Sequence, residues 1–183
     1  METKNQDNKM QKINVMRNIE IEKLTLNVGA GKDQVVLNKG IKLIKSITGV
    51  NPVKTVTMKR IPTWGLRPGL PVGCKITLRG KSAVNLVPRL LDAKSGMLPE
   101  SCFDERGSIS FGISEYIDIK EVKYDPEIGI MGLQACITLK RPGFRIKKRR
   151  IRRRNISKSH MISKEDAIEF MKSRFNIKVG EEE

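Results

Sequence analysis

The segment VGCKITLR at residues 72–79 alternates apolar and polar side chains without a break. Successive side chains of a β-strand point to opposite faces, so this pattern predicts a strand with one buried face and one face of cations and a hydroxyl. The segments KLTLNV at 23–28 and KTVTMKR at 54–60 alternate in the same way, with Val56 and Met58 expected to point inward. Three such strands predict a sheet that packs one face on a core and leaves the other face open. The side chains expected on the open face are Lys23, Thr25, Asn27, Thr55, Thr57, Lys59, Lys75, Thr77 and Arg79.

The remaining elements place this sheet in a mixed fold. Helices are expected at 32–48 and 81–94, where apolar residues recur at helical spacing, although Pro88 is expected to kink or shorten the second helix. Ser163 and Asp166 form a capping-box pattern that opens a third helix. Further strands are expected at 108–119 and 131–140. Strands outnumber helices and do not alternate strictly with them, which predicts an α+β fold: an antiparallel sheet with helices packed on one face.

Charge is sorted along the chain, whose formal net charge is +16. Residues 51–91 hold eight cations and no acid, residues 100–130 hold eight acids and three cations, and residues 141–160 hold ten cations and no acid. A merely solvated surface mixes the two signs, whereas separation of this kind is typical of polyanion binding. Two separated basic segments therefore predict two regions of contact with nucleic acid.

Other kinds of chemistry find little support. The three cysteines have neither zinc-site spacing nor an obvious disulfide framework, and the single histidine, His160, has no apparent catalytic partner. We therefore expect no catalytic residue, no metal, no cofactor and no small-molecule substrate. No run of eighteen apolar residues predicts a membrane span, and the polar first twelve residues do not resemble a secretory signal.

The aromatic residues and known motifs favour one kind of nucleic acid. One Trp, two Tyr and five Phe are scattered through the chain and form no paired platform on which unpaired bases stack. No helix-turn-helix or zinc-finger pattern supports reading of a DNA sequence. The residues therefore favour a folded RNA that is recognised by its backbone and shape.

The segment LTLNVGAGKD at 24–33 leads from a predicted strand through a glycine-rich turn into a predicted helix. A nucleotide-binding P-loop needs a glycine at position 26 and a hydroxyl at position 33, but these positions hold Leu26 and Asp33. Two interpretations stay open. Either Gly29 and Gly31 expose amides that bind an anion at the helix start, or the turn simply requires small residues.

Two rival functions stay open on the residues alone. An RNA-modifying or nucleotide-hydrolysing enzyme built around residues 29–33 would bind nucleotide with magnesium. A DNA-compacting basic protein would bind duplex DNA as tightly as it binds RNA.

Six segments together carry a family resemblance. They are LNVGAGK, NPVKT, WGLRPGLPVGCKITLRG, SCFDERGSISFGISEYIDI, KYDPEIGIMGL and RPGFRIKKRR. In this order, from about Met16 to about Val179, they resemble the large-subunit ribosomal protein five family, which binds 5S ribosomal RNA. The basic segment after residue 140 and the helix EDAIEF are similar to the archaeal and eukaryotic members. Trp64 and Pro68 depart from the family pattern, where phenylalanine and a polar or charged residue are expected.

The resemblance implies a non-catalytic ribosomal protein of the cytoplasm, built as a single domain over residues 1–183. It implies as partners 5S rRNA, large-subunit rRNA, the P-site tRNA and the ribosomal protein eighteen family, in the central protuberance of the large subunit. Taken position by position, it implies an RNA-binding face of Asn27, Gly29, Lys54, Thr55, Lys59, Arg60, Lys75, Thr77, Arg79 and Lys81. Most of these residues also belong to the open face that alternation predicts.

Two segments outside the strands complete the prediction. Residues 61–71 hold three prolines and two glycines, a composition typical of a stiff projecting loop. By resemblance this loop contacts tRNA, and Trp64 either packs beneath Arg67 or anchors the loop against the core. The basic arm spans residues 141–160. Its segment 141–154 has little apolar surface in Phe144, Ile146 and Ile151, so we expect this segment to order only on RNA. The loop contacts expected are Trp64, Gly65, Arg67, Pro68 and Gly69, and the arm contacts are Arg145, Lys147, Lys148, Arg149, Arg150, Arg152, Arg153 and Arg154.

Overall fold

A computed structural model describes residues 14–180 of the chain; the first twelve residues, on which the expectation of no secretory signal rests, lie outside this range. The centre of the fold is a five-stranded sheet in which every neighbouring pair is antiparallel. In spatial order its strands are β2 (Val53–Val56), β3 (Pro71–Leu78), β1 (Glu20–Gly29), β6 (Leu133–Lys140) and β5 (Ser108–Ile113).

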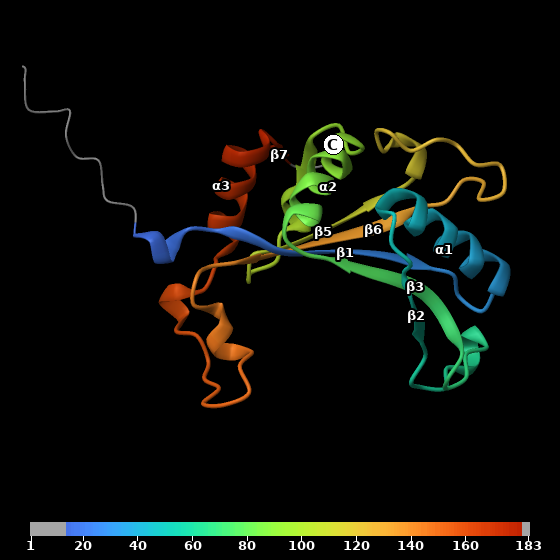
Figure 1. The fold of residues 1–183 in the computed structure, drawn as a ribbon, viewed down its shortest axis with the longest axis horizontal. Coiled ribbons are helices and arrows are strands. Elements are labelled where there is room, and N and C mark those ends of the chain that lie inside the picture. The colour runs from blue at the N-terminus through green and yellow to red at the C-terminus, as the bar shows by residue number, and fades with distance from the viewer. Residues whose placement is uncertain (1–13, 181–183) are drawn as a thin grey trace, which may run out of the picture.

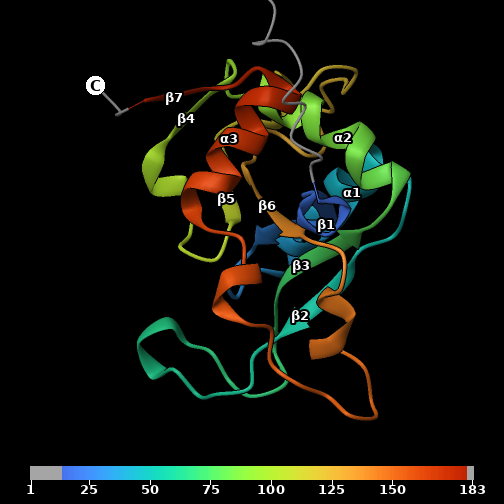
Figure 2. The same cartoon turned by 90° about the vertical axis from the view of Figure 1, so that its left-hand side faces the viewer.

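Three helices lie on the same side of this sheet: α1 (Gln34–Thr48), α2 (Lys81–Asp92) and α3 (Lys164–Phe175) (Figure 1). Figure 2 shows the same layering from the side. The buried side chains of strands and helices form one hydrophobic cluster between these two layers. The predicted α+β fold, with an antiparallel sheet covered on one face, is confirmed.

The helices form because their apolar residues repeat at the helical period. In α1 the buried residues Leu37, Leu43, Ile44 and Ile47 lie on one face, and the helix ends at Gly49, whose φ of 72° suits the left-handed C-cap. Gly40 lets α1 approach the sheet closely, because a Cβ there would lie 3.0 Å from Val28 Cγ1 and 3.2 Å from Cys74 Sγ. The helix layer therefore sits directly on the inward side chains of β1 and β3.

The third helix begins with the predicted capping box. The Asp166 backbone N–H donates to Ser163 Oγ at 3.2 Å, and the Ser163 backbone N–H donates to Asp166 Oδ2 at 3.0 Å. Arg141, buried to 6% exposure, pairs with the same carboxylate at 3.0 Å and donates to the Met161 carbonyl at 2.9 Å. Burial would raise the pKa of Asp166, but the hydrogen bonds from Ser163 and the charge of Arg141 outweigh it and lower that pKa.

Some predicted boundaries are wrong. The strand expected at 54–60 ends at Val56, and the expected inward residues Val56 and Met58 are 51% and 86% exposed, because Val56 ends an edge strand and Met58 lies in the loop beyond it. The strand expected at 108–119 ends at Ile113, where a 3₁₀ turn puts Tyr116 into the core. Pro88 does not shorten α2. The proline ring is exposed, and the helix continues to Asp92.

One strand pair was not predicted. β4 (Met97–Pro99) and β7 (Lys178–Gly180) form a short parallel ladder apart from the main sheet. Strands of three residues carry too little alternation to be recognised in the sequence.

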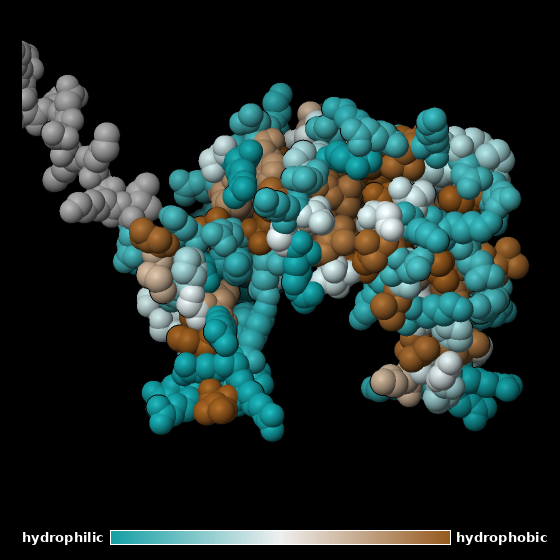
Figure 3. All heavy atoms as spheres, in the orientation of Figure 1, coloured by the Kyte–Doolittle hydropathy of each residue, from teal (hydrophilic) through white to brown (hydrophobic). Residues whose placement is uncertain are grey.

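Two segments project from the uncovered side of the sheet. One is the sheet loop, residues 57–70, which joins β2 to β3, and the other is the arm, residues 141–160. They leave opposite ends of the sheet and extend away from the helices (Figure 1). Figure 3 shows a hollow between these two projections, with the sheet as its roof.

Candidate nucleic-acid interface

The roof of this hollow is the uncovered face of the sheet, and strand register defines which side chains lie on it. Residues directly opposite in an antiparallel ladder point to the same face. Asn27 is opposite both Lys75 and Gln134, and Thr25 is opposite both Thr77 and Cys136. Extending these rows across the sheet defines the open face as Lys23, Thr25, Asn27, Gly29, Val53, Thr55, Gly73, Lys75, Thr77, Ser108, Ser110, Gly112, Gln134, Cys136 and Thr138.

Small and polar side chains dominate this face. Asn27 Nδ2 donates to Gln134 Oε1 at 3.1 Å, which fixes both amides at the centre of the face. Gly73 cannot be replaced without disturbing the sheet, since a Cβ there would lie 2.6 Å from the Val28 carbonyl oxygen and 3.0 Å from Thr55 Oγ1. The result is a shallow surface of hydroxyls, amides and lysines that a phosphate–sugar backbone can approach closely.

The structure places five of the ten residues of the predicted RNA-binding face on the open face. Asn27, Gly29, Thr55, Lys75 and Thr77 lie there together, and Lys75 and Thr77 are exposed. Gly29 ends β1, and the next three residues lead to Asp33, the N-cap of α1, whose side chain caps no amide. The glycine turn therefore borders the open face. This position is compatible both with anion binding by its amides and with a turn that simply requires small residues, so both interpretations stay open.

Five residues of the predicted RNA-binding face lie elsewhere, and two of them, Lys59 and Arg60, belong to the sheet loop. Lys54 is opposite the buried Cys74, which points toward α1, so Lys54 belongs to the helix side of the edge strand. Alternation in KTVTMKR already places Lys54 on the side of Val56 and Met58, so it was the family resemblance, and not the strand pattern, that assigned Lys54 to the RNA-binding face. Lys81 is the first residue of α2, and Arg79 follows β3 at the far end of the sheet.

The sheet loop carries the predicted tRNA contacts on a defined backbone. Ile61 and Leu66 exchange two backbone hydrogen bonds of 3.0 Å, and Leu66 is the buried anchor of the loop. Trp64 is 69% exposed, so the alternative in which Trp64 anchors the loop against the core is wrong. The other predicted contacts are also exposed: Gly65, Arg67, Pro68 and Gly69, with Lys59 and Arg60 at the start of the loop.

The base of the arm is fastened to the rest of the molecule. Arg141, counted among the arm cations, is the buried partner of Asp166 and is therefore a structural residue. Phe144 packs against the core and meets His160 edge-on, with ring centroids 5.8 Å apart. Lys148 forms an ion pair with Glu22, whose side chain is 13% exposed. Phe144 therefore packs against the core and not against the other apolar residues of the arm.

The tip of the arm is different, because its cations are exposed to solvent. Ile151 is 76% exposed, and the backbone around it turns back so that Arg149 Nε donates to the Arg152 carbonyl at 2.9 Å. Ordering of this tip on RNA stays a prediction. Its exposed cations are Arg149, Arg150, Arg152, Arg153 and Arg154, and Arg145 and Lys147 are exposed nearer the base.

Sequence reasoning missed the contribution of β5 and β6 to the open face. Leu133, Ala135, Ile137 and Leu139 are buried, as their alternation predicts, and the residues between them must then face the other way. The alternation in LQACITLK thus indicates that Gln134, Cys136 and Thr138 face outward. The missed polar residues are Ser108, Ser110, Gln134 and Thr138.

Other chemistry is not built into the described chain. Within residues 14–180 there is no group of three or more His, Cys, Asp or Glu that could hold a metal ion. Burial raises the pKa of the Cys74 thiol, which makes it a packing residue and a poor nucleophile. No helix in the same range is long and apolar enough to cross a membrane.

A polar sheet face between two cationic projections is typical of proteins that bind polyanions. Comparisons with known proteins specify the class further. Residues 14–67 match the family model described as "Ribosomal protein L5", and residues 71–170 match the model of the C-terminus of the same ribosomal family. The chain therefore belongs to the ribosomal protein L5 family.

Relatives of known name agree along most of the chain. "Large ribosomal subunit protein uL5" of Sulfurisphaera tokodaii is 44% identical over 172 residues, which is 93% of this chain and 97% of that relative. The proteins of the same name from Nanoarchaeum equitans and Methanococcus maripaludis (strain C6) are 44% and 40% identical, over 90% and 91% of this chain and 97% and 94% of the relatives. The resemblance to archaeal members of the family is confirmed.

Proposed function

We propose that this protein is a structural constituent of the large ribosomal subunit in the cytoplasm, acts as a single domain, and holds 5S rRNA on its open face. Family membership carries the ribosomal assignment, since the relatives are named as large-subunit proteins. The observation that supports the open face as the RNA site is its register. Asn27, Lys75 and Gln134 form one row, and Thr25 and Thr77 form the next. Hydroxyls, amides and lysines arranged in this way position a sugar–phosphate backbone without reading base sequence.

The two projections extend this proposal to further partners. The sheet loop presents Trp64 and Arg67 to solvent at one side of the hollow, an arrangement that supports contact with the P-site tRNA. The arm adds phosphate contacts to 5S or large-subunit rRNA at the other side. The ribosomal protein eighteen family, expected as a neighbour from the family resemblance, completes the proposed set of partners.

The direct test is the identity of the bound RNA. We expect 5S rRNA to copurify with the tagged full-length protein after a high-salt wash, as shown by sequencing of the retained RNA. Duplex DNA bound as tightly as 5S rRNA would favour the DNA-compacting rival. Saturable binding of nucleotide with magnesium at the Gly29–Asp33 turn would favour the enzyme.

A further inference from the structure

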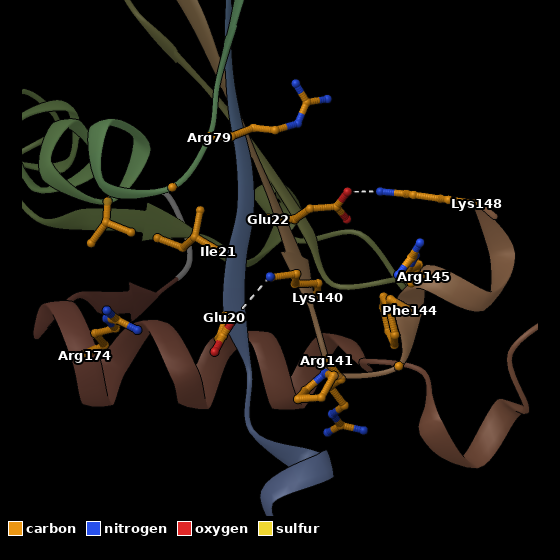
Figure 4. Close-up of a pocket in the computed structure, with 14 residues that line it drawn as sticks. Glu20, Ile21, Glu22, Arg79, Lys140, Arg141, Phe144, Arg145, Lys148 and Arg174 are labelled. Atoms are coloured by element: carbon orange, nitrogen blue, oxygen red, sulfur yellow. Dashed lines mark ion pairs between the residues drawn. The ribbon is translucent and has the colours of Figure 1, made fainter.

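A cavity of about 770 Å³ opens where β3 leaves the sheet. Pairing between β1 and β3 begins with Leu24 opposite Leu78, so residues 20–23 have no ladder partner on that edge of β1 within the described chain. The chain turns away through Arg79 and Gly80 into α2, and the base of the arm lies on the other side (Figure 4). We call this cavity the arm cleft.

The arm cleft has an excess of positive charge. Six Lys or Arg and two Glu line it. Glu20 pairs with Lys140 at 3.2 Å, and Glu22 pairs with Lys148. Arg141 is engaged by Asp166 outside the cleft, although its buried Nε has no hydrogen-bond partner. The lining cations that have no ion pair within residues 14–180 are Arg79, Arg145 and Arg174.

Two of these arginines lie on the same side of β1. Arg79 and Arg145 project on the side where Glu22 meets Lys148, whereas Arg174 lies across the strand (Figure 4). Glu22 reaches this side because a β-bulge between Ile21 and Lys23 shifts the register of β1. Two unpaired guanidinium groups beside a lysine that is already partly neutralised favour a doubly or singly charged oxyanion such as phosphate.

The cleft also offers an aromatic and apolar wall. Phe144 lines it at the base of the arm, and Ile21 and Val84 line it toward the helices. Volumes of roughly 300–1,000 Å³ are typical of pockets that hold a single small ligand, so the volume of this cleft suits one nucleotide. Unpaired RNA bases commonly stack on aromatic rings.

We propose that the arm cleft binds one unpaired nucleotide of the RNA, with its phosphate between Arg79 and Arg145 and its base against Phe144. This inference rests on the proposed RNA-binding function and adds a site beside the open face that holds a single residue of RNA. The unpaired edge of β1 then lies against the nucleotide, where its backbone amides and carbonyls are free to contact the base.

Cross-linking of the full-length protein with 5S or large-subunit rRNA tests the site. After ultraviolet irradiation and digestion, we expect cross-linked nucleotide on peptides that contain Phe144 or residues 20–23. The variant Phe144→Leu keeps an apolar side chain, and it should lose the cross-link at residue 144 while cross-links on peptides from the open face remain.

Affinity measurements test the phosphate contacts. The double variant Arg79→Gln, Arg145→Gln should bind rRNA about tenfold more weakly for each charge-assisted contact that it removes. Its dependence of log affinity on log salt should be flatter by about 0.7 per phosphate contact removed. Lys45→Gln with Lys94→Gln is the matched control, because it removes the same charge from exposed sites outside the cleft and should change neither quantity.

Competition by free ligands distinguishes binding of a nucleotide from binding of phosphate alone. Nucleoside monophosphates should suppress the Phe144 cross-link more strongly than inorganic phosphate does, since only they carry a base. Equal suppression by both would refute the base contact, and suppression by hexaglutamate alone would show a site for acidic peptide. Cross-links on the open face without any in the cleft would overturn this inference and leave the proposed function standing. Absence of rRNA binding would overturn both.

Discussion

Lys75 and Lys54 lie on neighbouring strands, but their side chains are on different faces of the sheet. Lys75 stands on the open face opposite Asn27, whereas Lys54 is opposite the buried Cys74 and faces the helix side. We expect Lys75→Gln to weaken 5S rRNA binding by about 1–3 kcal/mol, the range for one charge-assisted contact, and Lys54→Gln to leave it unchanged. Filter binding or calorimetry with 5S rRNA measures both. Equal losses in the two variants would refute the register argument.

Asp166 joins a helix cap to a buried cation, so its removal should affect stability. Asp166→Asn should lower the free energy of unfolding by about 1–2 kcal/mol at neutral pH, because a cap contributes about 1 kcal/mol and the ion pair is partly screened at 36% side-chain exposure. The pKa of Asp166 in the folded protein lies below its ordinary value of 3.8. The carboxylate therefore stabilises the fold above about pH 4, and this stabilisation is lost as the pH falls through the lowered pKa.

Urea denaturation at pH 6 and at pH 3 checks this prediction. The difference between wild type and Asp166→Asn should be largest at pH 6 and should shrink at pH 3. A difference that stays constant across this range would show that the charge of Asp166 contributes nothing. Glu165→Gln, one position earlier in the helix, is a control that removes a charge but no bond to Ser163 or Arg141.

Among the elements, the sheet loop carries the proposed tRNA contact, whereas the open face carries the proposed 5S rRNA contact. Its fold depends on Ile61 and Leu66, whereas Trp64 and Arg67 point into solvent. The double variant Trp64→Ala, Arg67→Gln should therefore leave melting temperature and 5S rRNA affinity unchanged. It should weaken retention of P-site tRNA by large subunits that contain it. If 5S rRNA affinity falls as far as it does in Lys75→Gln, the division between face and loop is wrong.

The arm has two parts, a base that contacts the rest of the molecule and a tip that is exposed to solvent. Its base is held by Arg141 and by the packing of Phe144, while its tip carries five arginines in solvent. This division explains why a segment so rich in like charge can begin in a fixed direction: a buried ion pair and an aromatic contact offset the repulsion there. Only the tip remains a candidate for ordering on RNA.

On the scale of the whole molecule, positive charge at both sides of the hollow should make RNA binding strongly dependent on salt. Replacing Arg149, Arg150, Arg152, Arg153 and Arg154 by Gln should flatten the fall of log affinity with log salt by roughly 0.7–0.9 for each phosphate that the arm no longer neutralises. The melting temperature should barely change, since these side chains are exposed to solvent. Titrations at several salt concentrations measure the slope, and a slope equal to that of wild type would remove the arm from the proposed interface.

Local patterns in the sequence determined the type of each main element. The alternation in β1, β3 and β6 followed from side chains that point to opposite faces, and the capping box of α3 followed from Ser163 and Asp166 alone. These features are local, because each depends on residues within one strand or one helical turn. The separation of charge along the chain likewise indicated a polyanion partner by itself.

Only the tertiary structure decided which of these residues meet. Strand register joined Gln134 to Asn27 across 107 positions of sequence. Burial made Arg141 a structural residue, although it begins the most basic segment of the chain. The arm cleft brings residues near 20, 80 and 145 together. Pairing and packing between distant segments set these outcomes, and a sequence pattern within one segment contains no information about its neighbour across the sheet.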